Sequence, residues 1–197
     1  MATMKLTKSQ SIRFMQSLGF NTLDCTITQD LVAVENELKD SSVLYSMRTE
    51  RGNEFACPFY FCKPAAEIIN FARQHLDEGY TLLIYPALPT VDCLAFGAIG
   101  LPASGELVIE VVEEAGLVRE LDNHTKKKTI IIKPGELRHV FAKNHSLKFP
   151  WAIEEVLSEV IYLLWDYPKP CVVEWSYYKR LVGALKKNAI YWEIRDY

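Results

Sequence analysis

Two apolar stretches near the carboxyl end decide the fold: CVVEWSY at residues 171–177 and AIYWEIR at residues 189–195. Side chains alternate between the two faces of a β-strand, so apolar residues at every second position predict a strand in each stretch. In the first stretch, the residues expected on the core face are Cys171, Val173, Trp175 and Tyr177. Glu174 then belongs to the opposite face.

The second stretch divides in the same way. The residues expected on its core face are Ile190, Trp192 and Ile194. The residues left on the other face are Tyr191, Glu193 and Arg195. If the two strands lie close together in one sheet, Glu174 and Glu193 face a common cleft with Arg195 beside them.

Such a cleft has a specific chemistry, because two carboxylates a few ångströms apart repel each other unless a proton, an arginine or a metal ion lies between them. Magnesium suits the pair, since it binds one or two protein carboxylates and completes its shell with water and nucleotide phosphates. The alternative is a set of surface ion pairs, each contributing roughly 0 to 1 kcal/mol. Spacing taken alone favours the ion pairs.

Length and composition predict a globular chain. With 197 residues, 49% of them hydrophobic, we expect one compact domain over residues 1–197, with lobes at 1–79 and 80–197. A net charge of -3 gives no electrostatic reason to expect a nucleic acid or a membrane as partner. The sequence shows neither a secretory apolar region nor an apolar run of about 20 residues, so we expect a cytoplasmic protein.

Periodicity and turn residues give the expected order of elements. Helices are predicted at residues 7–18, 31–38, 64–78 and 150–164. Strands are predicted, besides the two final ones, at residues 25–28, 43–48, 80–85, 94–99, 107–112 and 129–132. This order predicts an α+β fold with a mainly antiparallel sheet and packed helices. Glu110, inside one of these strands, is expected on its solvent face, and a functional role is the alternative.

Arg48 is the second informative position. It ends a predicted strand and is followed by a hydroxyl residue and a glycine-containing loop at residues 49–54. A guanidinium and backbone amides in this arrangement can bind phosphate oxygens. An exposed loop with a Glu50–Arg51 ion pair is the alternative. Walker A, dinucleotide-binding, nucleophile-elbow and zincin motifs are all missing from the sequence.

The order of these stretches resembles the nucleotide-binding domain of phosphoenolpyruvate synthase and pyruvate phosphate dikinase, which has an ATP-grasp fold. The resemblance rests on VEW at residues 173–175 and YWEIR at residues 191–195, together with YSMRTE at residues 45–50 and the stretch at residues 80–88. In that family, a glutamate in an acidic-aromatic phrase and a glutamine before an arginine hold magnesium and phosphates. Glu193 stands where the family has the glutamine.

The resemblance implies an ATP-grasp-like fold of two small lobes, with Mg²⁺ and ATP as ligands. By this resemblance, the metal ligands are Glu174 and Glu193. The phosphate contacts, which would also serve catalysis, are Arg48 and Arg195. The residues expected to line the adenine slot are Tyr85, Ala87 and Leu88.

The resemblance predicts an ATP-dependent phosphotransferase or ligase that acts on an unknown acceptor. The family's glycine-lysine phrase is missing, so the alternative is a catalytically silent relative that serves as a protein-binding or assembly module. In that case exposed aromatic residues such as Tyr178 and Tyr191 would form the contact surface. RNA binding through the lysines at residues 126–128 is a third possibility, which the negative net charge disfavours.

Overall fold

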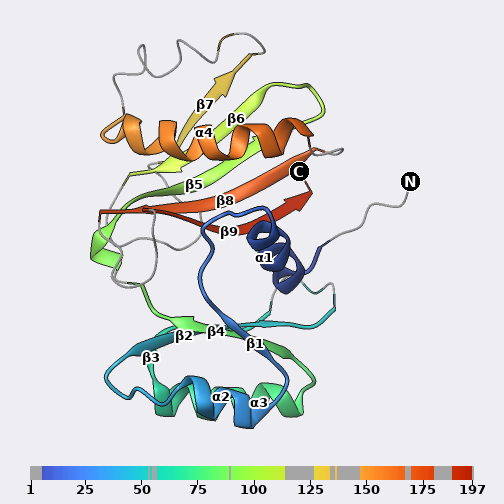
Figure 1. Cartoon of the computed structure of the whole chain (residues 1–197), viewed down its shortest axis with the longest axis vertical. Helices are drawn as coiled ribbons and strands as arrows, with labels where there is room; N and C mark the ends of the chain where they lie inside the picture. The colour runs from blue at the N-terminus through green and yellow to red at the C-terminus, as the bar shows by residue number, and fades with distance from the viewer. Residues whose placement is uncertain are drawn as a thin grey trace. The chain divides into compact units, whose positions relative to one another are not determined.

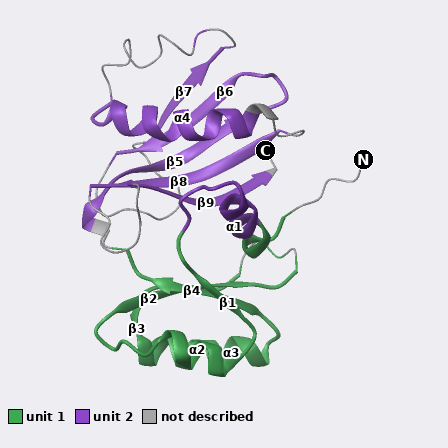
Figure 2. Ribbon diagram, viewed as in Figure 1, with its two compact units in different colours: residues 1–10, 23–88 green, residues 11–22, 89–197 purple. Residues whose placement is uncertain are grey.

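Two antiparallel sheets, each covered by helices on one face, account for the fold of this computed structural model (Figure 1). The structure describes residues 6–52, 54, 57–88, 90–113, 127–133, 136, 147–166, 170–179 and 188–196. The chain divides into two compact units (Figure 2). Unit 1 consists of residues 1–10 and 23–88, and unit 2 consists of residues 11–22 and 89–197.

The sheet of unit 1 has four strands in the order β1 (Thr26–Thr28), β4 (Thr81–Pro86), β2 (Leu44–Glu50) and β3 (Phe59–Pro64). Helices α2 (Leu31–Glu37) and α3 (Ala65–Asp77) pack on one face of it (Figure 1). Asp30 caps α2 through a 3.0 Å hydrogen bond from the Val32 N–H. The apolar core of this unit includes Val34, Met47, Ile68, Leu82 and Ile84.

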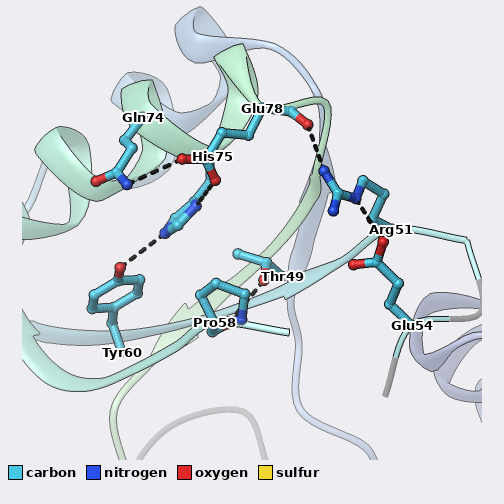
Figure 3. A network of polar contacts seen from close by, with 8 residues as sticks. All are labelled: Thr49, Arg51, Glu54, Pro58, Tyr60, Gln74, His75 and Glu78. Carbon is cyan, nitrogen blue, oxygen red and sulfur yellow. Dashed lines mark hydrogen bonds and ion pairs between the residues drawn. The ribbon is translucent and has the colours of Figure 1, made fainter. Parts of the chain in front are cut away.

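A polar network joins β3 to the end of α3 (Figure 3). The His75 side chain is buried, with Nε2 2.8 Å from the Tyr60 hydroxyl and Nδ1 2.9 Å from Oε2 of Glu78. The hydrogen bond from His75 lowers the pKa of Glu78. Arg51, just after β2, donates to the Glu78 carbonyl oxygen at 3.2 Å and to Glu54 Oε1 at 2.9 Å. The network therefore ties β2, β3 and α3 together.

The sheet of unit 2 has five strands in the order β7 (Lys128–Ile132), β6 (Leu107–Val112), β5 (Cys93–Leu101), β8 (Cys171–Tyr178) and β9 (Ala189–Asp196). A short 3-10 turn, η1 (Thr90–Asp92), precedes β5. Helix α4 (Pro150–Asp166) runs across one face of the sheet (Figure 1). The Tyr177 hydroxyl donates to Glu155 of α4 at 2.6 Å, and the Tyr191 hydroxyl donates to Glu159 at 2.7 Å.

The free edge of β9 is covered by residues 11–22, which follow the start of α1 (Lys8–Ser17). The Ile194 N–H donates to the Ser11 hydroxyl oxygen at 2.6 Å. The Tyr191 N–H donates to the Asn21 carbonyl oxygen at 3.0 Å, and the Asn21 side-chain amide donates to the Ala189 carbonyl oxygen at 2.6 Å. These bonds satisfy backbone groups that an exposed edge strand would otherwise present.

Glu113, at the end of β6, holds the start of α4. Its carboxylate accepts hydrogen bonds from Lys128 Nζ at 2.8 Å, from the Lys148 N–H at 3.0 Å and from the Phe149 N–H at 2.7 Å. Burial alone would raise the pKa of Glu113, but these three bonds outweigh it and hold the pKa below its ordinary value. The carboxylate thus supplies acceptors to backbone N–H groups next to the helix start.

Three expectations from the sequence are corrected. The division falls at residue 88 and not at residue 79, because β4 pairs with β1 and β2 of unit 1. Strand β2 continues through Thr49 and Glu50, where a loop was expected, because these residues pair with Leu82 and Thr81 of β4. Strand β3 was not predicted at all.

The predicted faces of the last strand are partly wrong. Tyr191 is fully buried and faces α4, although the alternation placed it with Glu193. The reason is a register shift between Glu174 and Trp175, which inserts one extra residue into β9. Tyr178 is also buried, at 2% exposure, so neither tyrosine provides the exposed aromatic surface expected for a protein-binding module.

Candidate functional site

A row of glutamates crosses the sheet of unit 2. Glu193 of β9 pairs with Glu174 of β8, Glu174 pairs with Ala98 of β5, and Ala98 pairs with Glu110 of β6. Residues paired across strands point to the same face of a sheet, so the three carboxylates share a face. Trp175, the neighbour of Glu174, is buried on the face that α4 covers, so the row lies on the opposite face. We call this set, Glu110, Glu174 and Glu193, the acidic row.

Register fixes the spacing within the row. The β-carbons of directly opposed residues lie about 4.5–5.5 Å apart, a spacing that lets two glutamate carboxylates reach one ion. Glu110 lies two strands from Glu174, which is about 10 Å. Between them stands Ala98, whose side chain is a single methyl group.

Two members of the acidic row, Glu174 and Glu110, are each paired with a basic side chain. Arg195 Nε lies 3.3 Å from Oε1 of Glu174, and both side chains are partly exposed, at 47% and 34%. Lys127 Nζ lies 2.7 Å from Oε1 of Glu110. The face therefore combines carboxylates with cations, which suits a ligand that carries both a metal ion and phosphate groups.

The number of carboxylates in the acidic row bears on how the row could bind magnesium. Within the described parts of the chain, no group of three or more His, Cys, Asp or Glu side chains is arranged to hold a metal ion. Glu174 and Glu193 alone supply hard oxygen ligands, which is the usual number for magnesium that is bound together with a nucleotide. The pair thus fits a metal–nucleotide complex better than a metal ion bound by protein alone.

The residues predicted in unit 1 lie on one sheet. Arg48 pairs with Leu83, and Ser46, two residues before it, pairs with Tyr85. Arg48 and Tyr85 therefore share a face, opposite to buried Met47. Burial raises the pKa of Tyr85, and the nearby Arg48 guanidinium partly offsets this effect. The Arg48 guanidinium carbon also lies 5.4 Å from the centre of the Phe59 ring.

Ala87 and Leu88 follow β4 and are half-buried. The Ala87 N–H donates to the Leu44 carbonyl oxygen at 2.7 Å, which extends the pairing of β4 with β2 by one bond. The predicted adenine residues thus continue directly from the strand that carries Tyr85.

The structure brings the predicted residues together in two groups. Glu174, Glu193 and Arg195 form one group in unit 2, as the sequence predicted from alternation. The other group, in unit 1, consists of Arg48, Tyr85, Ala87 and Leu88. The sequence did not link Glu110 to the first group, because strand register cannot be obtained from one sequence; its only signal was a charged residue amid the apolar residues of β6.

Two of the three lysines proposed for RNA binding form ion pairs with glutamates. Lys127 pairs with Glu110 and Lys128 with Glu113, at 2.8 Å. Lys126 lies outside the described residues. The two described lysines therefore balance the carboxylates of Glu110 in β6 and of Glu113 just after it.

Comparison with known proteins supports the fold. No protein-family model matches the sequence, and no curated protein matches it. Among solved structures, N5-carboxyaminoimidazole synthetase from Staphylococcus aureus complexed with ADP matches with a TM-score of 0.56 and 9% identity, over 95% of this chain and 43% of that chain.

Two further matches are to proteins crystallised with peptides. Macrocyclase MdnC bound with precursor peptide MdnA from Microcystis aeruginosa MRC has a TM-score of 0.52 and 12% identity, over 95% of this chain and 51% of that chain. A Chryseobacterium gregarium RiPP-associated ATP-grasp ligase, in complex with ADP and a leader and core peptide, has a TM-score of 0.51 and 8% identity, over 95% of this chain and 51% of that chain.

These matches define the class of fold: the chain has an ATP-grasp-like α+β fold, as expected. They do not single out phosphoenolpyruvate synthase and pyruvate phosphate dikinase within that class. The chain spans about half the length of the solved structures that it matches. None of the helices in the described parts is long and apolar enough to cross a membrane.

Proposed function

We propose that this chain binds ATP with Mg²⁺ and uses it for phosphoryl transfer or for ATP-dependent activation of an acceptor. The observation that carries the proposal is the direct pairing of Glu174 with Glu193, with Arg195 beside them on the same face of the sheet. The ATP-grasp-like fold and the ADP named in two of the matched structures support it.

Each residue has a role in this proposal. Glu174 and Glu193 would hold Mg²⁺, which when bound neutralises phosphate charge and orients the transferred group. Arg195 would bind phosphate oxygens, and its planar guanidinium suits two of them at once. In unit 1, Arg48 would bind phosphate, while Tyr85, Ala87 and Leu88 would line the adenine slot. Such chemistry depends mainly on positioning and charge stabilisation.

Resemblance to the nucleotide-binding domain of phosphoenolpyruvate synthase and pyruvate phosphate dikinase favours phosphoryl transfer. The matched structures instead include synthetases and a ligase, which favour activation of the acceptor. The peptides named in two of them make a peptide one acceptor to test.

The second candidate function is a catalytically silent binding or assembly module. Its support is that the sequence lacks the glycine-lysine phrase of the family that it resembles. A test of nucleotide binding separates the two functions, because a silent module is not expected to bind Mg-ATP through Glu174 and Glu193.

The test is thermal unfolding with and without Mg-ATP in excess. A ligand at one hundred times its dissociation constant stabilises the protein by about 2.7 kcal/mol. We expect a shift that needs magnesium in the wild type and is lost in the double variant Glu174→Gln, Glu193→Gln. The matched control is Glu35→Gln, Glu67→Gln, which removes the same charge from two exposed ion pairs of unit 1. An unshifted wild type would contradict the proposal.

A further inference from the structure

We infer that Arg195 is a built-in counter-cation of Glu174 and weakens the binding of a divalent metal ion to the Glu174–Glu193 pair. A nucleotide relieves this competition, because its phosphates bind Arg195 in place of Glu174. The first half of this inference concerns the protein and the metal alone. The second half rests on the proposed function.

The geometry of β8 and β9 carries the first half. Glu174 and Glu193 are paired across the two strands, and Arg195 lies two residues beyond Glu193, opposite Val172. Residues two apart on a strand point to the same face, so Arg195 shares the face of both carboxylates. Its Nε donates to Oε1 of Glu174 at 3.3 Å. The carboxylate of Glu174, one of the two proposed metal ligands, is therefore already engaged by a cation.

This contact has a clear electrostatic reason. Like charges directly opposed across a sheet are unfavourable, and a guanidinium beside them offsets the repulsion. A divalent ion bound beside Arg195, at a separation on the order of 5 Å, would be repelled by the positive charge of the guanidinium. In water, that repulsion corresponds to a loss of metal affinity on the order of tenfold at low ionic strength.

Within the described residues, the ion pair of Lys127 lies apart from that of Arg195. Lys127 pairs with Glu110, two strands from Glu174. Glu174 is also flanked on this face by Ala98, Val172 and Ser176, which carry no charge. A change at Arg195 therefore alters the charge at the Glu174–Glu193 pair and leaves the Lys127–Glu110 pair intact.

A nucleotide gives Arg195 a better acceptor. Phosphate oxygens accept two parallel hydrogen bonds from a guanidinium, whereas Arg195 makes a single, partly exposed contact with Glu174. Transfer of Arg195 to phosphate frees Glu174 for the metal ion. Metal and nucleotide then bind with positive coupling, and linkage requires each to raise the affinity for the other by the same factor.

The test is Mn²⁺ binding, followed by electron paramagnetic resonance of the free ion at low ionic strength. Without nucleotide, we expect Arg195→Gln to bind Mn²⁺ about tenfold more tightly than the wild type. Arg195→Lys, which keeps the charge, should stay near the wild-type affinity. The matched control is Arg73→Gln, which removes an exposed ion pair with Glu35 and should leave Mn²⁺ affinity unchanged.

Added ADP tests the second half, after correction for Mn²⁺ bound by ADP in solution. ADP should raise the Mn²⁺ affinity of the wild type by a larger factor than that of Arg195→Gln, because the variant has no counter-cation to release. Equal factors in the two proteins would overturn the coupling.

The two proposals fail in different ways. Unchanged or weaker Mn²⁺ binding by folded Arg195→Gln, with ADP still bound by the wild type, would overturn the role of Arg195 and leave the nucleotide function standing. Tighter Mn²⁺ binding by the variant, with no ADP effect on either protein, would confirm the counter-cation and overturn both the coupling and the nucleotide function. Circular dichroism confirms that each variant is folded.

Discussion

Glu113→Gln removes the carboxylate that joins β6 and β7 to the start of α4. Glu113 is 5% exposed and accepts three hydrogen bonds, one from Lys128 and two from the backbone N–H groups of Lys148 and Phe149. A glutamine keeps the shape but replaces one acceptor oxygen with an NH₂ group, which opposes either Lys128 or a backbone N–H. We therefore expect a loss of stability.

The size of the loss follows from the contacts. Hydrogen bonds to charged groups contribute about 1.5–3 kcal/mol each. The Lys128 side chain is 34% exposed, so water compensates part of its loss. We expect Glu113→Gln to lower the free energy of unfolding by about 2–3 kcal/mol, which for a chain of this length lowers Tm by about 4–12 °C.

The pH dependence provides a second signature. The pKa of Glu113 in the folded protein lies below its ordinary value of 4.5. A carboxyl group with a lowered folded pKa contributes its full stability above its unfolded pKa and loses it as the pH falls through the folded pKa. The difference between wild type and Glu113→Gln should therefore be complete at neutral pH and shrink below a pH of about 4.5.

Urea unfolding followed by circular dichroism, at neutral pH and at a pH below about 4.5, measures the difference in stability between the wild type and Glu113→Gln. The matched control is Glu154→Gln, an exposed position on α4, where we expect a change within about 0.5 kcal/mol. A Glu113→Gln variant as stable as this control at neutral pH would refute the reasoning, as would a difference that grows in acid.

Two further predictions concern stability. Gly97→Ala would place a β-carbon 2.0 Å from the Glu110 carbonyl oxygen, so β5 and β6 must separate; we expect a loss of about 1–3 kcal/mol in urea unfolding, and an unchanged midpoint would contradict the close approach. His75→Phe leaves the Tyr60 hydroxyl without its nitrogen partner; we expect a loss of about 1–3 kcal/mol. Thermal unfolding measures it, and a Tm equal to that of the wild type would show that the network of Figure 3 adds no stability.

Local patterns were sufficient for most elements of the fold. Alternation in residues 171–177 and 189–195 located β8 and β9, and the proline at residue 150 marked the start of α4. The same alternation placed Glu174 on the face of the sheet opposite to Trp175. These predictions succeeded because each depends on residues that are close in sequence.

Non-local pairing explains what the sequence left out. Strand β3 contains Cys62 with a φ of 55° and carries the extra residue of a register shift against β2, so its alternation is interrupted. The irregularity in β9 that buries Tyr191 has no signal in the sequence. The acidic row was missed for a related reason, because Glu110 joins Glu174 only through the register of β5 with both of its neighbours.

The most direct test of the central claim is calorimetric titration of the protein with ADP, with and without Mg²⁺. The proposed function predicts binding that is much tighter with Mg²⁺ in the wild type. In the double variant Glu174→Gln, Glu193→Gln, it predicts that Mg²⁺ no longer strengthens binding, while the control Glu35→Gln, Glu67→Gln behaves like the wild type. Equal magnesium dependence in the double variant, or no ADP binding by the wild type, would contradict the claim that Glu174 and Glu193 form a metal–nucleotide site.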